Sequence, residues 1–343
     1  MPPSALPRLI SPIPGVVVTA ALGGVAVVSA RWLSGELPRV GIDAVVLAIL
    51  LGIAVRALWH PPAWAHDGIA LAAKQLLEVA IVLLGFATDV RWMARAGGVL
   101  ASAIVVTTIL ALGVGLLWGR LFGLPRSHAL LVASGNAICG NSAIAAVASV
   151  IGAKREETAS AVAYTAILSL ALVLVLPFVR AWLALDDLSY GVATGLTVYA
   201  VPQVLAAAYP VSVQAGQVGT VVKLVRVLML IPLVTIVSLL ERKVAHHEEA
   251  VVPWGRVVPW YVMGFLVATV LRSSEVVPPF VSGGAQQGSH LLTVISMAAL
   301  GLGVEVELLR RVGWRTAATA TVSLLSLCAL AAVVVMWLPT TAP

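Results

Sequence analysis

The residues most able to do chemistry are gathered in one short stretch. It reads GNAICGNSAI from Gly135 to Ile144, in the middle of an apolar run over 128–151. Asn, Ser and Cys side chains donate and accept hydrogen bonds, whereas Gly and Asn are poor helix formers. We therefore predict a helix break, whose free N–H groups can hold an anion and whose free carbonyls can hold a cation. A small-residue packing face with Asn cross-links is the alternative. The predicted substrate-binding residues here are Asn136, Cys139, Gly140, Asn141 and Ser142.

A second interruption falls in the apolar run 190–209, at Tyr199-Ala200-Val201-Pro202-Gln203. Pro202 removes a backbone hydrogen bond and frees a carbonyl about one turn earlier. Gln203 and Tyr199 add polar ends, and Gln203 is a further predicted substrate-binding residue. A proline kink without a ligand is the alternative.

Three charged residues lie deep in apolar runs. Lys223 and Arg226 are three positions apart in the run 216–240 and share one helical face. They are predicted to attract an anionic substrate, or else to extend toward the lipid headgroups. Glu78, in the run 69–89, is predicted to carry a coupling proton or to neutralise Lys223 or Arg226.

Composition places these residues in a membrane. The chain has 343 residues, of which 60% are apolar and 10% charged, and its mean hydropathy is +1.04. A water-soluble protein is excluded, because ordinary soluble domains are about 25% charged. The chain is predicted to be an all-α polytopic protein with about ten or eleven spans and no soluble domain, so the net charge of +6 does not indicate nucleic-acid binding. The candidate spans are 13–33, 42–58, 69–89, 98–120, 128–151, 159–183, 190–209, 216–240, 257–272, 285–304 and 315–338.

The positive charges predict an orientation. With the N-terminus inside, inner loops hold twelve Lys and Arg and outer loops seven, so a cytoplasmic N-terminus is expected. Cys139 and Cys328 both lie in apolar runs, which argues against a disulfide framework or a zinc site. Motifs of hydrolases, metalloproteases and nucleotide-driven pumps are absent, so no enzyme, cofactor or metal is expected. The His-His-Glu-Glu run at 246–249 is read as a solvated loop.

The sequence also contains an internal repeat. A shift of 216 residues pairs Gly85 with Gly301, Arg56 with Arg272, Arg95 with Arg311 and Asp89 with Glu305. The paired runs are seven spans apart, and an odd separation predicts an inverted-topology repeat of the kind found in secondary transporters. Chance agreement between Leu- and Gly-rich helices is the alternative. The predicted repeats cover about 41–183 and 190–338, with 13–33 as an extra helix, and a weaker echo links 142–177 to 201–232.

Four segments carry a resemblance to a known family. They are GNAICGNSAIAAVA (135–148), KQLLEVAIVLLGF (74–86), ETASAVAYTAIL (157–168) and TVVKLVRVLML (220–230). With them the chain, from about residue 40 to 315, resembles the YeiH-like bacterial inner-membrane proteins, often labelled as proposed sulfate exporters. The resemblance implies a fold of the bile-acid:sodium symporter type, with inverted repeats and broken crossing helices. The chain departs from the family at 199–203, where a His and an acidic residue are frequent before the Gln, which puts proton coupling through that stretch in doubt.

We therefore expect a secondary transporter that exports a small inorganic or sulfur-containing anion such as sulfate. The expected partners are the anion, the lipid bilayer and a coupling proton or sodium ion, with a homodimer left open. Two alternatives remain: a cation-coupled organic acid transporter of the same fold, and a non-transporting membrane scaffold or regulatory subunit. A membrane enzyme using Cys139 as nucleophile is a more distant third, because no His lies in a neighbouring span core to activate the thiol.

Overall fold

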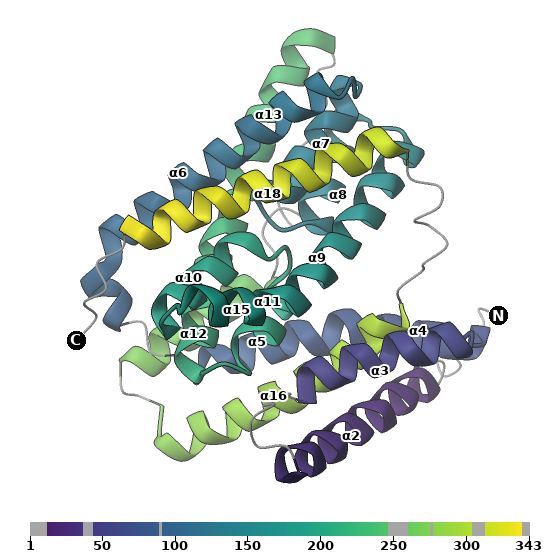
Figure 1. Ribbon diagram of the computed structural model, residues 1–343, viewed down its shortest axis with the longest axis vertical. Coiled ribbons are helices and arrows are strands. Elements are labelled where there is room, and N and C mark those ends of the chain that lie inside the picture. The colour runs from purple at the N-terminus through teal and green to yellow at the C-terminus, as the bar shows by residue number, and fades with distance from the viewer. Residues whose placement is uncertain are drawn as a thin grey trace, which may run out of the picture. The chain divides into compact units, whose positions relative to one another are not determined.

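The computed structural model describes residues 12–36, 44–88, 91–245, 260–274, 277–303 and 313–337. These residues form helices joined by short links, and no β-strand occurs among them (Figure 1). The chain divides into two compact units, each formed by two stretches of sequence. The first unit comprises Met1–Arg91 and Tyr261–Glu305, and the second Trp92–Trp260 and Val306–Pro343. Each unit thus combines segments from both predicted repeats, whose boundaries stay a prediction.

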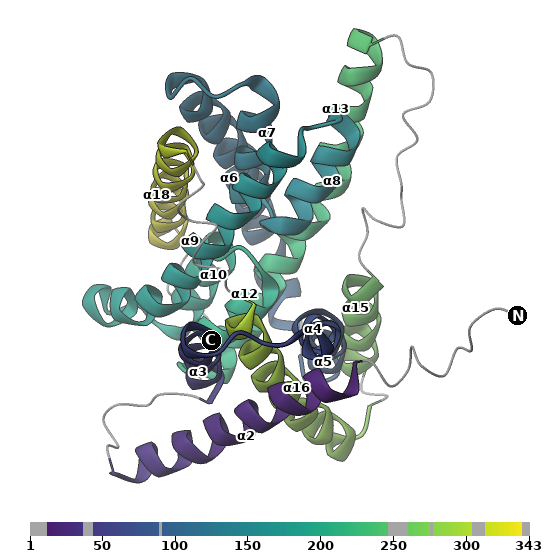
Figure 2. The same ribbon diagram turned by 90° about the vertical axis from the view of Figure 1, so that its right-hand side faces the viewer.

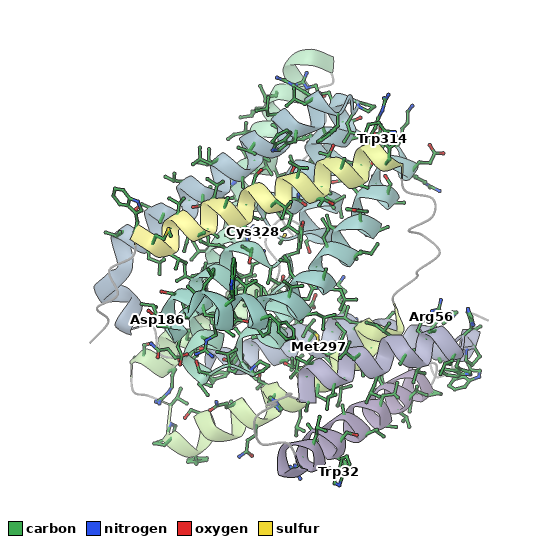
Figure 3. The ribbon with its side chains drawn as sticks, viewed as in Figure 1. Trp32, Arg56, Asp186, Met297, Trp314 and Cys328 are labelled. Carbon is green, nitrogen blue, oxygen red and sulfur yellow. The ribbon has the colours of Figure 1, made fainter. Side chains whose placement is uncertain are left out.

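Length and composition confirm a polytopic membrane protein. Six helical stretches among the described residues are long and apolar enough to cross a membrane: Ile13–Leu33, Ala63–Gly85, Gly98–Leu121, Arg155–Leu183, Val213–Glu241 and Trp314–Trp337. Trp32 and Trp314, near the ends of two of these stretches, are each 67% exposed and project outward (Figure 3). Tryptophan is enriched at membrane–water interfaces, which fits these positions.

The first unit is built from α2 (Ile13–Glu36), α3 (Ala44–Leu58), α4 (Ala63–Leu71), the π-helical turn η1 (Ala72–Leu76), α5 (Leu77–Gly85), α15 (Trp260–Ser273) and α16 (Pro279–Leu302). α16 packs along α3 and also contacts α2, η1 and α5 (Figures 1 and 2). Small residues allow these close approaches, because lipid-embedded helices associate by packing small side chains face to face. The Ser289 hydroxyl of α16 donates to the Ala80 carbonyl of α5 at 2.7 Å.

Two glycine contacts in this unit mirror each other. A Cβ on Gly85 would lie 2.6 Å from the Phe265 carbonyl oxygen and 2.8 Å from Ala268 Cβ. A Cβ on Gly301 would overlap the Ile49 carbonyl oxygen and lie 2.9 Å from Gly52 Cα. Each residue of one contact is 216 positions from its counterpart in the other. One pair of packing contacts thus has the spacing of the sequence repeat, and the inverted-topology repeat itself stays a prediction.

The second unit contains α6 (Arg91–Leu121), α7 (Arg126–Ala137), α8 (Asn141–Ile151), α9 (Arg155–Leu183), α10 (Asp187–Thr197), α11 (Val201–Ala208), α12 (Val213–Leu228), α13 (Leu230–Ala245) and α18 (Trp314–Trp337). α10 and α12 pack closely: a Cβ on Gly195 would lie 2.6 Å from the Gly219 carbonyl oxygen. Trp118 Nε1 donates to Ser326 Oγ at 3.1 Å and joins α6 to α18. Asp186 begins α10 by accepting the Ser189 N–H at 2.7 Å.

The expected span 216–240 is divided into α12 and α13 at Met229. Pro232 lacks an N–H group, so the Leu228 carbonyl cannot receive the usual helical hydrogen bond, and the helix is interrupted about one turn before the proline. Asp89, Glu305 and Arg311, which the repeat pairs, lie outside the described residues, as does the loop 246–249.

Candidate functional site

One interrupted helix carries the stretch GNAICGNSAI. α7 ends at Ala137 and α8 begins at Asn141. Between them Gly140 has a φ of +67°, a conformation that glycine adopts without the steric penalty of a Cβ. The predicted helix break is therefore present, and it leaves free carbonyls at the end of α7 and free N–H groups at the start of α8.

The second interrupted helix consists of α10 and α11. α10 ends at Thr197, Ala200 is extended with φ −110° and ψ 145°, and α11 begins at Val201. Pro202 lies in the first turn of α11, where its missing N–H group has no carbonyl partner to lose. This break is also present where the sequence predicts one.

Arg226 of α12 joins the carboxyl ends of α7 and α10, the first halves of the two broken helices. Its Nε and NH2 donate to the Ala137 carbonyl at 3.2 and 2.7 Å, and NH2 also donates to the Asn136 carbonyl at 3.1 Å. Its NH1 donates to the Gly195 carbonyl at 3.0 Å and to the Leu196 carbonyl. The side chain is 1% exposed. All five guanidinium N–H groups are thus used on backbone carbonyls.

Lys223, one turn earlier on α12, lies against the first break. Its side chain is completely buried, and Nζ donates to the Ile138 carbonyl. In the part of the chain that the structure describes, no Asp or Glu is buried. Neither cation extends toward the headgroups, so the structure places both within the protein, at the breaks.

Asn136 and Tyr199 connect the two breaks. The Tyr199 hydroxyl donates to Asn136 Oδ1 at 2.9 Å, and Asn136 Nδ2 donates to the Ala320 carbonyl of α18 at 2.9 Å. Tyr199 Cβ lies 3.3 Å from where a Cβ on Gly140 would stand. Asn136 and Gly140, both predicted to bind substrate, therefore make contacts inside the protein.

The amino end of α8 is open. Asn141 and Ser142, its first two residues, are exposed. The Thr165 hydroxyl of α9 donates to Asn141 Oδ1 at 3.2 Å. Asn141 Nδ2 has no partner among the described residues, and the first backbone N–H groups of a helix have no intrahelical acceptor. Several donors therefore point out of this helix end.

The amino end of α11 contacts the same face of α9, although most of its backbone donors are used. The Gln203 and Val204 N–H groups donate to the Ala200 carbonyl, and Pro202 has no N–H group. Gln203, which is half-buried, accepts on Oε1 from the Ser169 hydroxyl of α9 and from the Ala200 N–H at 3.2 Å. Its Nε2 makes no hydrogen bond to any residue that the structure describes. Thr165 and Ser169 are one turn apart on the same face of α9. α9 therefore holds the amino ends of α8 and α11 beside each other.

We call these five residues the N-terminal cluster: Asn141, Ser142, Thr165, Ser169 and Gln203. The cluster presents hydroxyl and amide groups and contains no charged side chain. Each helix amino end contributes the equivalent of about half a positive charge. Such a set of donors is suited to an anion.

Both cysteines lie near the breaks. Cys139 is 8% exposed, and its sulfur faces the Ala143 N–H and the Ser142 hydroxyl. Cys328 of α18 packs against the cluster of buried residues that contains Tyr199 (Figure 3). Neither cysteine forms a disulfide.

Glu78 belongs to the other unit. It lies in the first turn of α5 and is half-buried. Lys223 and Arg226 belong to the second unit, so the predicted neutralisation of either one by Glu78 stays a prediction.

Sequence reasoning did not select Thr165 and Ser169. Both are ordinary small residues in a long apolar helix, where a hydroxyl usually bonds back to its own helix. Thr165 does so as well, because its single hydroxyl proton is shared between the Val162 carbonyl at 3.0 Å and Asn141 Oδ1 at 3.2 Å. Their four-residue spacing within ETASAVAYTAILSL was the available signal. This spacing indicates a shared site only once the two helix breaks are known to contact α9.

The chain matches the family model described as "Conserved hypothetical protein 698" over residues 14–320. It is 45% identical over 338 residues to a UPF0324 membrane protein of Bradyrhizobium diazoefficiens, covering 98% of this chain and 96% of the relative. A UPF0324 membrane protein of Brucella melitensis is 43% identical over 332 residues, covering 96% and 91%.

A more distant relative extends the match beyond these two bacteria. A UPF0324 membrane protein of Pseudomonas aeruginosa is 33% identical over 314 residues, which cover 88% of this chain and 87% of the relative. These matches support the YeiH-like resemblance that the four sequence segments indicate. The chain belongs to the UPF0324 family of membrane proteins, which the matching model describes as conserved hypothetical protein 698.

Proposed function

We propose that this membrane protein is a secondary transporter that exports a small anion, with the N-terminal cluster as its binding site. The observation that carries the proposal is the pairing of two half-helix amino ends by Thr165 and Ser169 on one face of α9. The exposed first residues of α8, Asn141 and Ser142, supply backbone N–H groups, and the amide nitrogens of Asn141 and Gln203 are unused among the described residues. An anion gains hydrogen bonds and favourable helix dipoles without needing a charged side chain.

The two buried cations also favour a negatively charged ligand. Lys223 and Arg226 lie at the carboxyl ends of α7 and α10, within the same unit as the cluster. No buried carboxylate offsets them among the described residues. The buried charged side chains at the breaks are therefore Arg226 and, when it is protonated, Lys223, and the sign of their charge favours anions over cations.

Sulfate or a related sulfur oxyanion is the proposed substrate, and a proton or a sodium ion is the proposed coupling ion. Several oxygens on one compact anion match donors that arrive from two helix ends. Glu78 is a half-buried acidic residue in the first turn of α5, and it is one proposed carrier of a coupling proton. An inner-membrane location with a cytoplasmic N-terminus completes the proposal, and a homodimer is compatible with it.

The test measures uptake of radiolabelled sulfate, sulfite and methanesulfonate into proteoliposomes under proton and sodium gradients. Asn141→Asp and Gln203→Glu replace an amide donor by a negatively charged acceptor of nearly the same shape. We expect each to reduce uptake at least about tenfold, because a carboxylate repels the anion. Gln214→Glu is the control, since Gln214 is exposed in the first turn of α12.

Failure of the wild-type protein to move any of these anions under either gradient contradicts the proposal. Stabilisation by sodium together with an organic carboxylate, but not by sulfate, favours the organic acid transporter instead. Full function of cells that carry Asn141→Ala and Lys223→Ala favours the scaffold. Each result thus selects one of the alternatives that the sequence leaves open.

A further inference from the structure

Lys223 and Arg226 differ in how their donors are used. Arg226 has all five N–H groups on carbonyls, whereas Lys223 Nζ has a single hydrogen bond, to the Ile138 carbonyl. Lys223 is completely buried, and Nζ has no second acceptor among the described residues. Lys223 is therefore a buried amine whose capacity to form hydrogen bonds is only partly used.

The charges around Lys223 do not balance it. The carboxyl ends of α7 and α10 each supply the equivalent of about half a negative charge. Together they offset about one of the two cations. An uncompensated buried charge is costly, and the group that can lose its charge is the lysine, because a guanidinium stays protonated in proteins.

The titratable groups that face Lys223 are few. On its own helix it meets Arg226, and from the first break it meets Cys139. α10 and α11 bring Tyr199 toward Arg226 through the link between them. α13, which contacts α12, has one acidic residue among those described, Glu241, near its far end. None of these groups places a carboxylate beside Nζ.

We infer that the bound anion is accompanied by one proton, which Lys223 holds on its side-chain nitrogen. In the empty site the amine is neutral and donates to the Ile138 carbonyl. When the anion arrives, the nitrogen lone pair takes a proton from water and the ammonium balances the new negative charge. When the anion leaves, the same proton returns to water, so the two ions move together in a fixed ratio of one to one.

This inference rests on the proposed function and assigns the coupling to Lys223 rather than to Glu78. It explains how anion binding and proton binding become linked without a carboxylate in the site. It also separates the two cations, because Arg226 joins the helices permanently while Lys223 changes its charge with occupancy.

The test is proton uptake by the purified full-length protein in weakly buffered detergent solution, followed with a pH-sensitive dye. Sodium sulfate and sodium methanesulfonate are the probes, because neither anion itself takes up protons near neutral pH. We expect about one proton to be taken up per bound anion. The dissociation constant should rise about tenfold for each pH unit, as linkage of one proton requires.

Two variants at one position separate charge from titration. Lys223→Arg carries a fixed charge, so it should bind the anion without proton uptake and with little dependence on pH. Lys223→Met has nearly the same volume without the charge and should lose binding by at least about tenfold. The control is Lys154→Met, at an exposed position before α9, which should keep binding and proton uptake.

The outcomes distinguish this inference from the proposed function. Anion binding by the wild type without proton uptake overturns the role of Lys223 and leaves the transporter intact. Loss of proton uptake in Glu78→Gln, with uptake retained in Lys223→Arg, assigns the proton to Glu78 and also overturns it. Absence of binding and of transport for every anion overturns both. The wild-type measurements require no variant, so they decide the matter even if the Lys223 variants fail to fold.

Discussion

The Tyr199 hydroxyl donates to Asn136 Oδ1 over 2.9 Å, although 63 positions separate the two residues in sequence. The link between α10 and α11 is thereby fixed to the last turn of α7. Asn136 Nδ2 is used at the same time on the Ala320 carbonyl of α18. One amide side chain thus connects three separate parts of the second unit.

Tyr199→Phe tests this connection. The substitution removes the donor and leaves Asn136 Oδ1 buried without its partner, so we expect a loss of about 1–3 kcal/mol in stability. Thermal unfolding in detergent measures it as a lower melting temperature. Tyr164→Phe is the comparison, because the Tyr164 hydroxyl contacts Thr321 at 3.1 Å from a half-buried position and should matter less. Equal melting temperatures for Tyr199→Phe and the wild type would refute the prediction.

Arg226→Lys tests the joint between the broken helices. A lysine keeps the charge but cannot reach four carbonyls on two helices with a single nitrogen. Each buried carbonyl that is left without a donor costs about 1–3 kcal/mol, so we expect little monodisperse protein by gel filtration. Arg155→Lys, at the exposed start of α9, should purify like the wild type. Normal yield and elution of Arg226→Lys would contradict the account of this residue.

Gly140→Ala tests the backbone at the first break. A side chain at a φ of +67° is strained, and the new methyl group would lie 3.3 Å from Tyr199 Cβ. We expect a loss of about 1–3 kcal/mol. Gly113→Ala is the matched control, because it lies within α6 with nothing within 4 Å and should gain about 0.5–1 kcal/mol in the helix. The two melting temperatures should therefore shift in opposite directions, and a shift in the same direction would count against the assigned geometry.

Gly301→Ala tests the reciprocal packing in the first unit. The new methyl group would meet backbone atoms of Ile49 and Gly52, which cannot rotate away. Overpacking of this kind typically costs about 1–3 kcal/mol. Gly283→Ala lies on the same helix, α16, in open space and should be tolerated. Gly85→Ala, at the counterpart position, should behave like Gly301→Ala, and a neutral effect at both positions would show that the contacts are loose.

Thr165→Val tests the support given by α9. Valine has the same shape but no hydroxyl, so Asn141 loses the donor that orients its amide. If the cluster binds the proposed anion, we expect its dissociation constant to rise about three- to tenfold, equivalent to the loss of one hydrogen bond. Thr158→Val, whose hydroxyl only bonds to its own helix, is the control. Unchanged anion binding in Thr165→Val would remove Thr165 from the cluster.

Much of the fold can be predicted from the sequence because its signals are local. Apolar runs ending at charge, Pro or Gly predict helices that begin and end within a few residues of the observed ones, as for α18, Trp314–Trp337, against 315–338. Gly140 and Pro202 mark the two breaks, since glycine permits a positive φ, whereas proline fixes its own φ and lacks an N–H group. These inferences need no knowledge of neighbouring helices.

The candidate site is harder to predict because its contacts join distant segments. The spacing of Lys223 and Arg226 places them on one helical face, but it does not reveal that this face meets backbone carbonyls instead of solvent or headgroups. Thr165 and Ser169 carry no unusual chemistry until α8 and α11 are placed beside α9. The roles of such residues depend on tertiary packing, which one sequence does not display.

The five hydrogen bonds of Arg226 also set a mechanical limit. Because α12 grips the last residues of α7 and of α10 through one rigid planar group, these three segments cannot slide past one another without breaking several buried bonds at once. We therefore expect α12 and the last turns of α7 and α10 to move together as one rigid body. In the transporter proposed above, the hinge of any movement that opens the N-terminal cluster to either side of the membrane would therefore lie outside these three segments.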